Sequence, residues 1–270
     1  MRGIGTIVLG VAALFASSLG VVASASASPP QYLACVKAAK SGKAYTGAYA
    51  DKTCSEASPG HDGKYELGAP KLPAKVKGTV GKVDIYLYNP LTKAIEGHFE
   101  CSSGKESGEI VSGTEGTLST SYSLCHATGQ LAGPCESPGQ KAGVVVSESL
   151  DTRLVWLDEA QTEPGVAVTA ASPGGDITQV QCAGGAETAE LTGTMLASVG
   201  PTNEAAKAQT ISFGADPGDG EPDFSGTWEE GTFQAAGLLS SLKGIREYGG
   251  VPTSQSSVFT QKGPALLIGG

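Results

Sequence analysis

The stretch KVKGTVGKVDIYLYNPLTKAIEGHFEC, residues 75–101, holds two runs of alternating apolar and polar side chains on either side of a turn. The turn is NPLT, residues 89–92, in which the proline suits the second turn position. Because successive side chains of a strand point to opposite faces, each run predicts an antiparallel strand with one face in the core and one in water. The core-facing set is Val83, Ile85, Leu87, Ile95, Gly97, Phe99 and Cys101, and the water-facing set is Asp84, Tyr86, Tyr88, Glu96, His98 and Glu100.

The same alternation recurs through the rest of the chain to about residue 250. Glycine, threonine, serine and valine are abundant, and long stretches with helical periodicity are nearly absent. The sequence therefore predicts an all-β fold, either an antiparallel β-sandwich or a partly closed barrel. We assign residues 28–75 to an N-terminal disulfide-clipped segment, residues 76–250 to the β domain and residues 251–270 to a tail.

Two parts of this β domain resemble each other. FECSSGKESGEIVSGTEGTL at 99–118 and VQCAGGAETAELTGTML at 180–196 each contain a cysteine, a polar loop, an acidic–aliphatic pair and Gly-Thr. The match indicates either two related β modules or a chance similarity between stretches rich in glycine and threonine. We expect each cysteine of the pair to lie at a strand end.

The N-terminus has the layout of a secretory signal. Arg2 provides the positive charge, residues 4–22 are almost wholly apolar, and ASASA at 23–27 provides small residues for a signal peptidase. We expect cleavage after Ala27, which makes Ser28 the first residue of a secreted, extracellular protein. An uncleaved anchor helix is the alternative, because the apolar run is nearly long enough to cross a bilayer.

All six cysteines lie beyond this apolar run. An even number of cysteines behind an export signal predicts three disulfides formed in an oxidising compartment. No two cysteines have the C-x-x-C spacing of zinc or thioredoxin-like redox sites. The expected pairs are Cys35–Cys54 and Cys125–Cys135, which close short loops, and Cys101–Cys182, which would link the two modules.

The chain carries a formal net charge of −9. An acidic protein is unsuited to nucleic acid or to an anionic membrane surface, so we expect neither as a partner after signal cleavage. The Gly-x-Ser-x-Gly motif of serine hydrolases is absent, and the three histidines, His61, His98 and His126, do not stand in an oriented acid–base pair. We therefore predict no catalytic residue and no cofactor.

Two groups of side chains are candidates for metal binding. Imidazole and carboxylate on one strand face suit a divalent transition metal, and a carboxylate-rich loop suits calcium. The alternative in both cases is a solvated polar surface, and the loop lacks the ligand order of an EF-hand. The groups are Glu96, His98 and Glu100 on the strand, and Asp216, Asp219, Glu221 and Asp223 in the loop DPGDGEPD.

Aromatic side chains are the weak candidates for ligand contact. Tyr86 and Tyr88 share the polar face of one strand and, with Trp156 and Trp228, could stack on a sugar ring. A purely structural role for both tryptophans is the alternative. A cell-envelope component or a glycan is the ligand class that this reading suggests.

Several phrases together resemble a group of uncharacterised secreted six-cysteine β proteins of high-GC Gram-positive bacteria. The phrases are YLACVKAAKSGKAYTGAYADKTC (32–54), GKYEL (63–67), GEIVSGTEG (108–116), CESPGQKAGVVVSESLDTRL (135–154), VQC (180–182) and TFQAAGLL (232–239). The resemblance implies a bacterial source, an export signal and β architecture, and it carries no activity with it. The C-terminal tail is longer and more polar than the resemblance would suggest.

The sequence thus favours a non-catalytic extracellular or cell-envelope protein with a binding or structural role. A secreted glycan hydrolase is the alternative function. Such an enzyme would need two carboxylates facing each other across a groove.

Overall fold

The structure is a computed structural model, and it describes the chain from residue 28 onward with short gaps. The described ranges are 28–89, 94–129, 132–183, 187–216, 221–222, 226–229, 232–235, 238–242, 246–248, 253–261 and 266–269. All the regular secondary structure in these ranges is β-strand, which confirms the predicted all-β class. The expected signal peptide, residues 1–27, lies outside the described residues.

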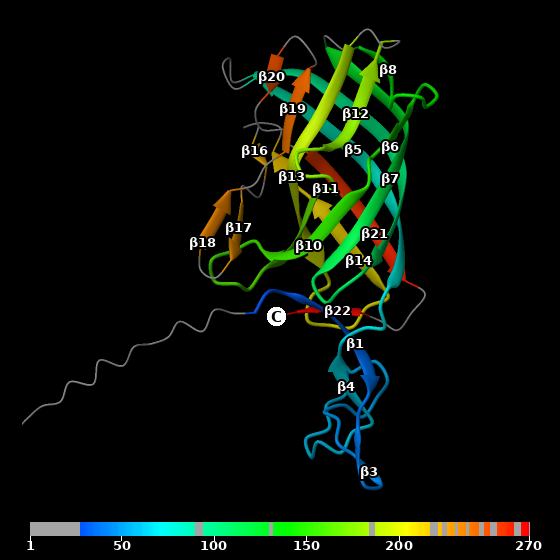
Figure 1. Ribbon diagram of the computed structural model, residues 1–270, viewed down its shortest axis with the longest axis vertical. Coiled ribbons are helices and arrows are strands. Elements are labelled where there is room, and N and C mark those ends of the chain that lie inside the picture. Colours follow the sequence, from blue (N-terminus) through cyan, green and yellow to red (C-terminus); the bar gives the residue numbers. More distant parts are fainter. Residues whose placement is uncertain are drawn as a thin grey trace, which may run out of the picture.

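Eight strands form one closed antiparallel barrel (Figure 1). Each barrel strand pairs with the next one along the chain, and the last pairs with the first, so the connectivity is up-and-down with insertions. Closure removes the exposed edges that an open sheet would have. The barrel strands are β5 (Ala74–Asn89), β6 (Ala94–Ile110), β7 (Glu115–Gly129), β10 (Leu150–Trp156), β11 (Pro164–Ala170), β13 (Glu187–Gly200), β14 (Ala208–Phe213) and β21 (Thr253–Gln261).

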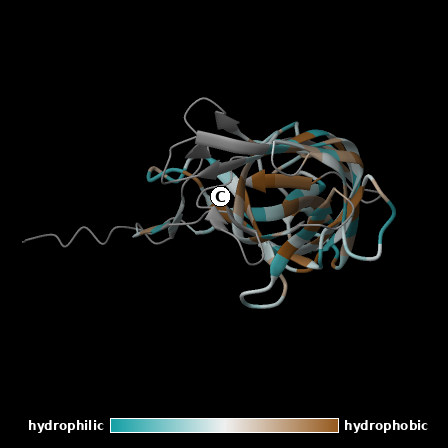
Figure 2. Cartoon of the chain, turned by 90° about the horizontal axis from the view of Figure 1, so that it is seen from above, coloured by the Kyte–Doolittle hydropathy of each residue, from teal (hydrophilic) through white to brown (hydrophobic). Residues whose placement is uncertain are grey.

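The alternation predicted around residues 75–101 decides which side chains face the barrel interior. Val83, Ile85, Phe99 and Cys101 are buried in the main core, as predicted. The side chains of residues 87–97 are outside the described set. Seen from above, the barrel wall shows polar and apolar residues alternating along its strands (Figure 2).

Further strands extend this wall. β8 (Gly133–Glu136) and β12 (Asp176–Cys182) pair with each other, and also with β7 and β13 respectively. The strands β17 (Gly226–Glu229) and β18 (Thr232–Ala235) form a hairpin beside the end of β10. The remaining short strands of this wall are β9 (Val144–Val146), β19 (Leu238–Leu242) and β20 (Arg246–Tyr248), while β15 (Ala215–Asp216) and β16 (Glu221–Pro222) form a separate two-stranded sheet.

The N-terminal segment forms a small unit that protrudes from one end of the barrel (Figure 1). Its strand β1 (Gln31–Lys37) pairs with β4 (Tyr65–Gly68) on one side and with β22 (Leu266–Gly269) on the other. The short strands β2 (Lys40–Ser41) and β3 (Ala44–Tyr45) form a hairpin within it. The barrel starts at Ala74, next to the predicted domain boundary.

The expectation that residues 251–270 form a tail is wrong. Residues 253–261 are β21, which closes the barrel between β14 and β5, and residues 266–269 are β22. The sequence TSQSSVFTQ of β21 is polar at most positions, so it shows little of the apolar alternation by which the other strands are recognised.

The disulfides are partly as expected. Cys35–Cys54 is confirmed, whereas the other cysteines pair as Cys101–Cys125 and Cys135–Cys182. Strand register is the reason, because Cys101 lies directly opposite Cys125 across β6 and β7, and Cys135 lies opposite Cys182 across β8 and β12.

The two similar stretches do not form two separate modules that face each other. The two similar stretches both fall within strands of one sheet, which closes around a single interior. Cys182 ends β12, but Cys101 lies in the middle of β6, so the two cysteines are not equivalent. In the part of the chain that the structure describes, no helix has the length and apolar character needed to cross a membrane.

Candidate functional site

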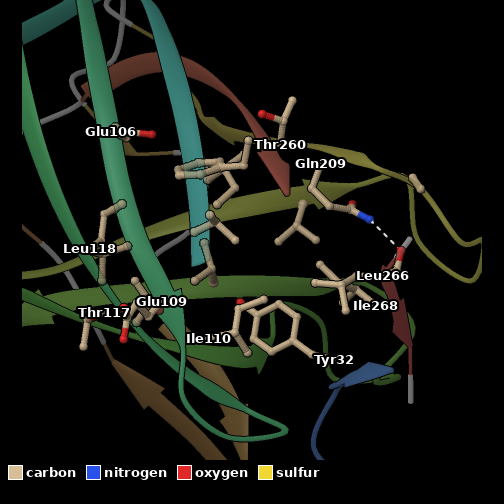
Figure 3. Close-up of a pocket in the computed structure, with 18 of the residues that line it drawn as sticks. Tyr32, Glu106, Glu109, Ile110, Thr117, Leu118, Gln209, Thr260, Leu266 and Ile268 are labelled. Atoms are coloured by element: carbon tan, nitrogen blue, oxygen red, sulfur yellow. Dashed lines mark hydrogen bonds between the residues drawn. The ribbon is translucent and has the colours of Figure 1, made fainter. Parts of the chain in front are cut away.

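A cavity of about 80 Å³ lies inside the barrel (Figure 3). Its walls are mostly apolar, because the inward positions of β7, β11, β13 and β14 carry branched aliphatic side chains. Three aromatic side chains, those of Tyr32, Phe213 and Phe259, also line it. The aliphatic lining consists of Val76, Ile110, Leu118, Val166, Val168, Val199, Ala206, Ile211, Leu266 and Ile268.

Three of these side chains, Tyr32, Leu266 and Ile268, come from the β1–β22 pair and form the floor of the cavity (Figure 3). Backbone hydrogen bonds hold this floor to the barrel. The amide of Tyr32 donates to the carbonyl of Gly113 at 2.7 Å, and Ala206 and Leu266 exchange two hydrogen bonds of 2.8 and 2.9 Å. Burial raises the pKa of the Tyr32 phenol far above its ordinary value.

Glu106 brings a carboxylate into the apolar cavity. The residue is only 5% exposed, and the hydroxyl of Thr120 donates to its Oε1 at 3.3 Å. Burying a carboxylate is costly unless hydrogen bonds or a cation compensate it, and the hydrogen bond from Thr120 is one such compensating contact. The side chain sits at the inward position of β6 between Gly104 and Gly108.

Gln209 is the second polar group, near the floor. Its Nε2 donates to the carbonyl of Leu266 at 3.3 Å, and its Oε1 is buried with no hydrogen-bond partner among the described residues (Figure 3). At the rim, Glu109 pairs with Lys75 at 3.6 Å, and the exposed Lys207 also lines the cavity.

This arrangement suits a small, largely apolar ligand. Eight-stranded barrels have an interior that either is filled by side chains or holds one small molecule. A cavity of about 150 Å³ takes up benzene, and about 10–15 Å³ is enough for one water, so 80 Å³ leaves room for more than a single water. Apolar walls with a few convergent polar groups are the usual composition of a ligand pocket.

The predicted metal-binding face of β6 forms a different cluster. His98 and Glu100 come together with Asp84, and one ligand atom from each lies within 4.8 Å of the others. The ammonium of Lys82 lies between the carboxylates, 3.2 Å from Asp84 and 2.6 Å from Glu100, and its hydrogen bond to Glu100 raises the pKa of Lys82. The cluster therefore already contains its own cation.

Among the described residues, the remaining metal-binding candidates and the other two histidines do not come together in one site. In the acidic loop, Asp216 and Glu221 are backbone partners of β15 and β16, and Asp219 and Asp223 lie outside the described residues. The Glu96 side chain is likewise not described. His61 lies in an exposed turn with a positive φ, and His126 is exposed on β7.

The described aromatic side chains predicted to contact a ligand lie in two different places. Trp156 and Trp228 are cross-strand partners, and both line an outer groove of about 600 Å³. Tyr86 instead stacks on His98, with ring centroids 4.8 Å apart, and the Tyr88 side chain is not described. An adjoining hollow of about 440 Å³ shares Glu115, Arg153 and Gln234 with this groove, and we call the two together the tryptophan groove.

Sequence reasoning missed Glu106, Gln209 and Tyr32. A signal existed for Glu106, since alternate positions inward along β6 are Gly104, Glu106, Gly108 and Ile110, and a charge in that series is unexpected.

No family model, no curated protein and no solved structure matches this chain.

Proposed function

We propose that the protein binds a small, largely apolar molecule inside its barrel and performs no chemistry on it. The observation that carries the proposal is the cavity of about 80 Å³ closed at one end by the β1–β22 floor. A barrel that needed only stability would fill this space, because interiors are close-packed and unfilled volume costs free energy.

We further propose that binding takes place outside the cytoplasm. Three disulfides are typical of extracellular proteins. The N-terminal sequence favours export with cleavage after Ala27. Sequencing the N-terminus of protein recovered from the culture medium should give Ser28 first, and an intact Met1 would contradict cleavage.

Toluene is a suitable first probe for the cavity, and isothermal calorimetry is the measurement. Val168→Phe places a ring in the cavity, whereas Val258→Phe makes the same chemical change at an exposed position on β21. We expect toluene to bind the wild type and Val258→Phe alike, and to bind Val168→Phe at least about tenfold more weakly. Equal binding to all three proteins would place toluene outside the barrel and reject the proposal.

The tryptophan groove supports a second candidate function, saccharide binding or carboxylate-dependent hydrolysis. Glu115 lines both parts of it, Asp151 lines the smaller hollow, and the two tryptophans line the outer groove. Aromatic faces beside carboxylates are suited to sugar rings and to glycoside chemistry.

The test of this second candidate uses soluble cell-wall oligosaccharides and an assay of reducing ends. Hydrolysis would release reducing ends and would be lost in Glu115→Gln or Asp151→Asn. Binding without release would leave a saccharide-binding role. If the protein neither binds the oligosaccharides nor releases reducing ends, the candidate is excluded.

A further inference from the structure

We infer that the outer face of the barrel wall binds a divalent transition-metal ion of the zinc class. Its ligands are Asp84, His98 and Glu100, with His126 as the fourth. The site lies on a different face of the wall from the cavity and does not depend on the proposed function. Four features support it: the strand positions of these residues, the spacing of their ligand atoms, the cation that already lies among them, and the kinds of atom that they offer.

The four residues lie on three neighbouring strands, β5, β6 and β7, which run side by side in the wall (Figure 1). Asp84 is directly opposite Glu100 across β5 and β6, and Glu100 is directly opposite His126 across β6 and β7. His98 is two residues from Glu100 on β6, so the two side chains share a face. That face is the outer one, because the flanking residues are buried in the core: Val83, Ile85, Phe99, Cys101, Cys125 and Ala127.

The ligand atoms are already close together. One atom from each of Asp84, His98 and Glu100 lies within 4.8 Å of the other two, and His98 Nε2 is 2.6 Å from Asp84 Oδ1. Ligand atoms about 2.0 Å from a tetrahedral zinc ion are about 3.3 Å apart, so small side-chain rotations bring the three into that geometry. Tyr86 stacks on the His98 ring, with centroids 4.8 Å apart and planes at 11°, and thereby limits the orientations of the imidazole.

Lys82 marks the point where a cation binds. Its ammonium lies 2.6 Å from Glu100 and 3.2 Å from Asp84, where both carboxylates converge. The lysine side chain is 56% exposed, whereas those of Asp84 and Glu100 are 14% and 23% exposed. Because a lysine has a flexible four-carbon stem, it turns into solvent while the carboxylates stay in place. One ammonium balances one carboxylate, whereas a divalent ion beside a neutral imidazole balances both.

The donor atoms specify the class of metal. Calcium and magnesium take oxygen ligands, whereas imidazole nitrogen combined with carboxylate oxygen suits zinc and its neighbours. His126 adds a second imidazole, because the Cβ atoms of cross-strand partners such as His126 and Glu100 are about 5 Å apart. Its exposed side chain turns toward the ion without displacing core residues. Two carboxylates and two imidazoles make up the four-coordinate set that zinc prefers.

Isothermal calorimetry with zinc chloride tests the site, on protein without a histidine tag that has been treated with a chelator. We expect one zinc ion to bind per chain, and calcium and magnesium to bind at least about tenfold more weakly than zinc. Calcium binding as tightly as zinc would mean that imidazole is not a ligand. No zinc binding at millimolar concentration would mean that Lys82 and the carboxylates form an ordinary ion-pair cluster. Either result would overturn the inference.

Histidine variants locate the ion. His98→Ala removes one ligand and should weaken zinc binding by at least about tenfold. The matched control is His61→Ala, which removes an exposed imidazole from the N-terminal unit and should leave the affinity within about twofold. Equal losses in these two variants would show non-specific binding and reject the site. His126→Ala should weaken zinc by about threefold or more, and an unchanged affinity would reject His126 as the fourth ligand.

Lys82 variants test the competition between ammonium and metal. Lys82→Met removes the charge and keeps a flexible side chain, so zinc should bind at least about threefold more tightly. Lys82→Arg keeps a cation beside the carboxylates and should not tighten zinc binding. Weaker zinc binding to Lys82→Met than to the wild type would show that the ammonium does not occupy the place of the metal.

An NMR measurement on the wild type locates the ion even if a variant fails to fold, as judged by circular dichroism. Zinc should shift the imidazole resonances of His98 and His126 and leave those of His61 unchanged. Shifts at His61 alone would place the ion outside the barrel wall and overturn the inference. The toluene titration of the cavity has a separate outcome, so the two proposals stand or fall independently.

Discussion

Single residues decide how closely the barrel strands approach one another. At Gly108 on β6, an added Cβ would overlap the carbonyl oxygen of Thr117 on β7. Backbone, unlike a side chain, cannot rotate out of the way. Glycine at inward positions of long strands lets the wall curve tightly enough to close.

Gly108→Ala should therefore destabilise the protein by about 2 kcal/mol or more, since the β6–β7 ladder must shift. Chemical denaturation measures the loss. The control is Ser107→Ala at the neighbouring exposed position, which should change the free energy of unfolding by less than about 0.5 kcal/mol. Similar stability of both variants would show that the close approach of the two strands is unimportant.

Tyr32 should make the protein sensitive to alkali. Its pKa is raised by burial, so the folded state holds a proton that the unfolded state, with a pKa of about 10, releases. The stabilisation is fully present below about pH 10 and is lost as the pH rises toward the folded-state value. We expect the denaturation midpoint to fall between pH 8 and pH 11 by more in the wild type than in Tyr32→Phe. An equal fall would contradict the role of burial.

At the residue scale, the sequence predicted correctly which side chains are buried where apolar and polar residues alternate. Val83, Ile85, Phe99 and Cys101 are buried as expected, because an inward apolar side chain and an outward polar one give opposite signals. Glu106 could not be recognised as part of the site, since a carboxylate reads as solvent-facing unless the strand phase is known. Asp84 was likewise not linked with His98 and Glu100, because their meeting depends on the β5–β6 register.

Among the elements, the two C-terminal strands contribute to both the wall and the floor of the site. β21 completes the barrel wall, and β22 supplies Leu266 and Ile268 to the cavity floor. The sequence did not reveal either role. β21 has polar residues on both faces, so its own pattern does little to specify a strand. Its place is set more by its neighbours β5 and β14, which each need a pairing partner.

Deleting residues 266–270 should open the floor while leaving the eight barrel strands in place. Toluene should bind the truncated protein at least about tenfold more weakly, because two apolar contacts are lost and water enters. Calorimetry measures the affinity, and circular dichroism verifies the fold. Unchanged affinity in a folded truncated protein would mean that the floor plays no part in binding.

Disulfide pairing also belongs to the level of elements. Cys35–Cys54 could be predicted because it closes a short loop within one segment. The other two pairs depend on which strands are neighbours. Once β8 lies beside β12, Cys135 and Cys182 face each other across a sequence separation of 47, and proximity along the chain no longer decides the pairing.

For the whole molecule, closure of the sheet is the property that creates a binding site. The sequence predicted the class and left sandwich and barrel open, because both present the same alternating strands to a core. Only the long-range pairings β7–β10 and β21–β5 distinguish the two, and these unite residues far apart in the chain. The same closure brings Tyr32, Glu106 and Gln209, from three distant segments, to one cavity.

The most direct test of internal ligand binding is an NMR measurement of nuclear Overhauser effects between toluene and the methyl groups of the wild-type protein. We predict contacts to the cavity-lining methyls of Leu118, Val166 and Val168, and none to the exposed methyls of Val258. Contacts to Val258 alone, or no contacts under conditions where toluene is in large excess, would contradict a ligand site inside the barrel.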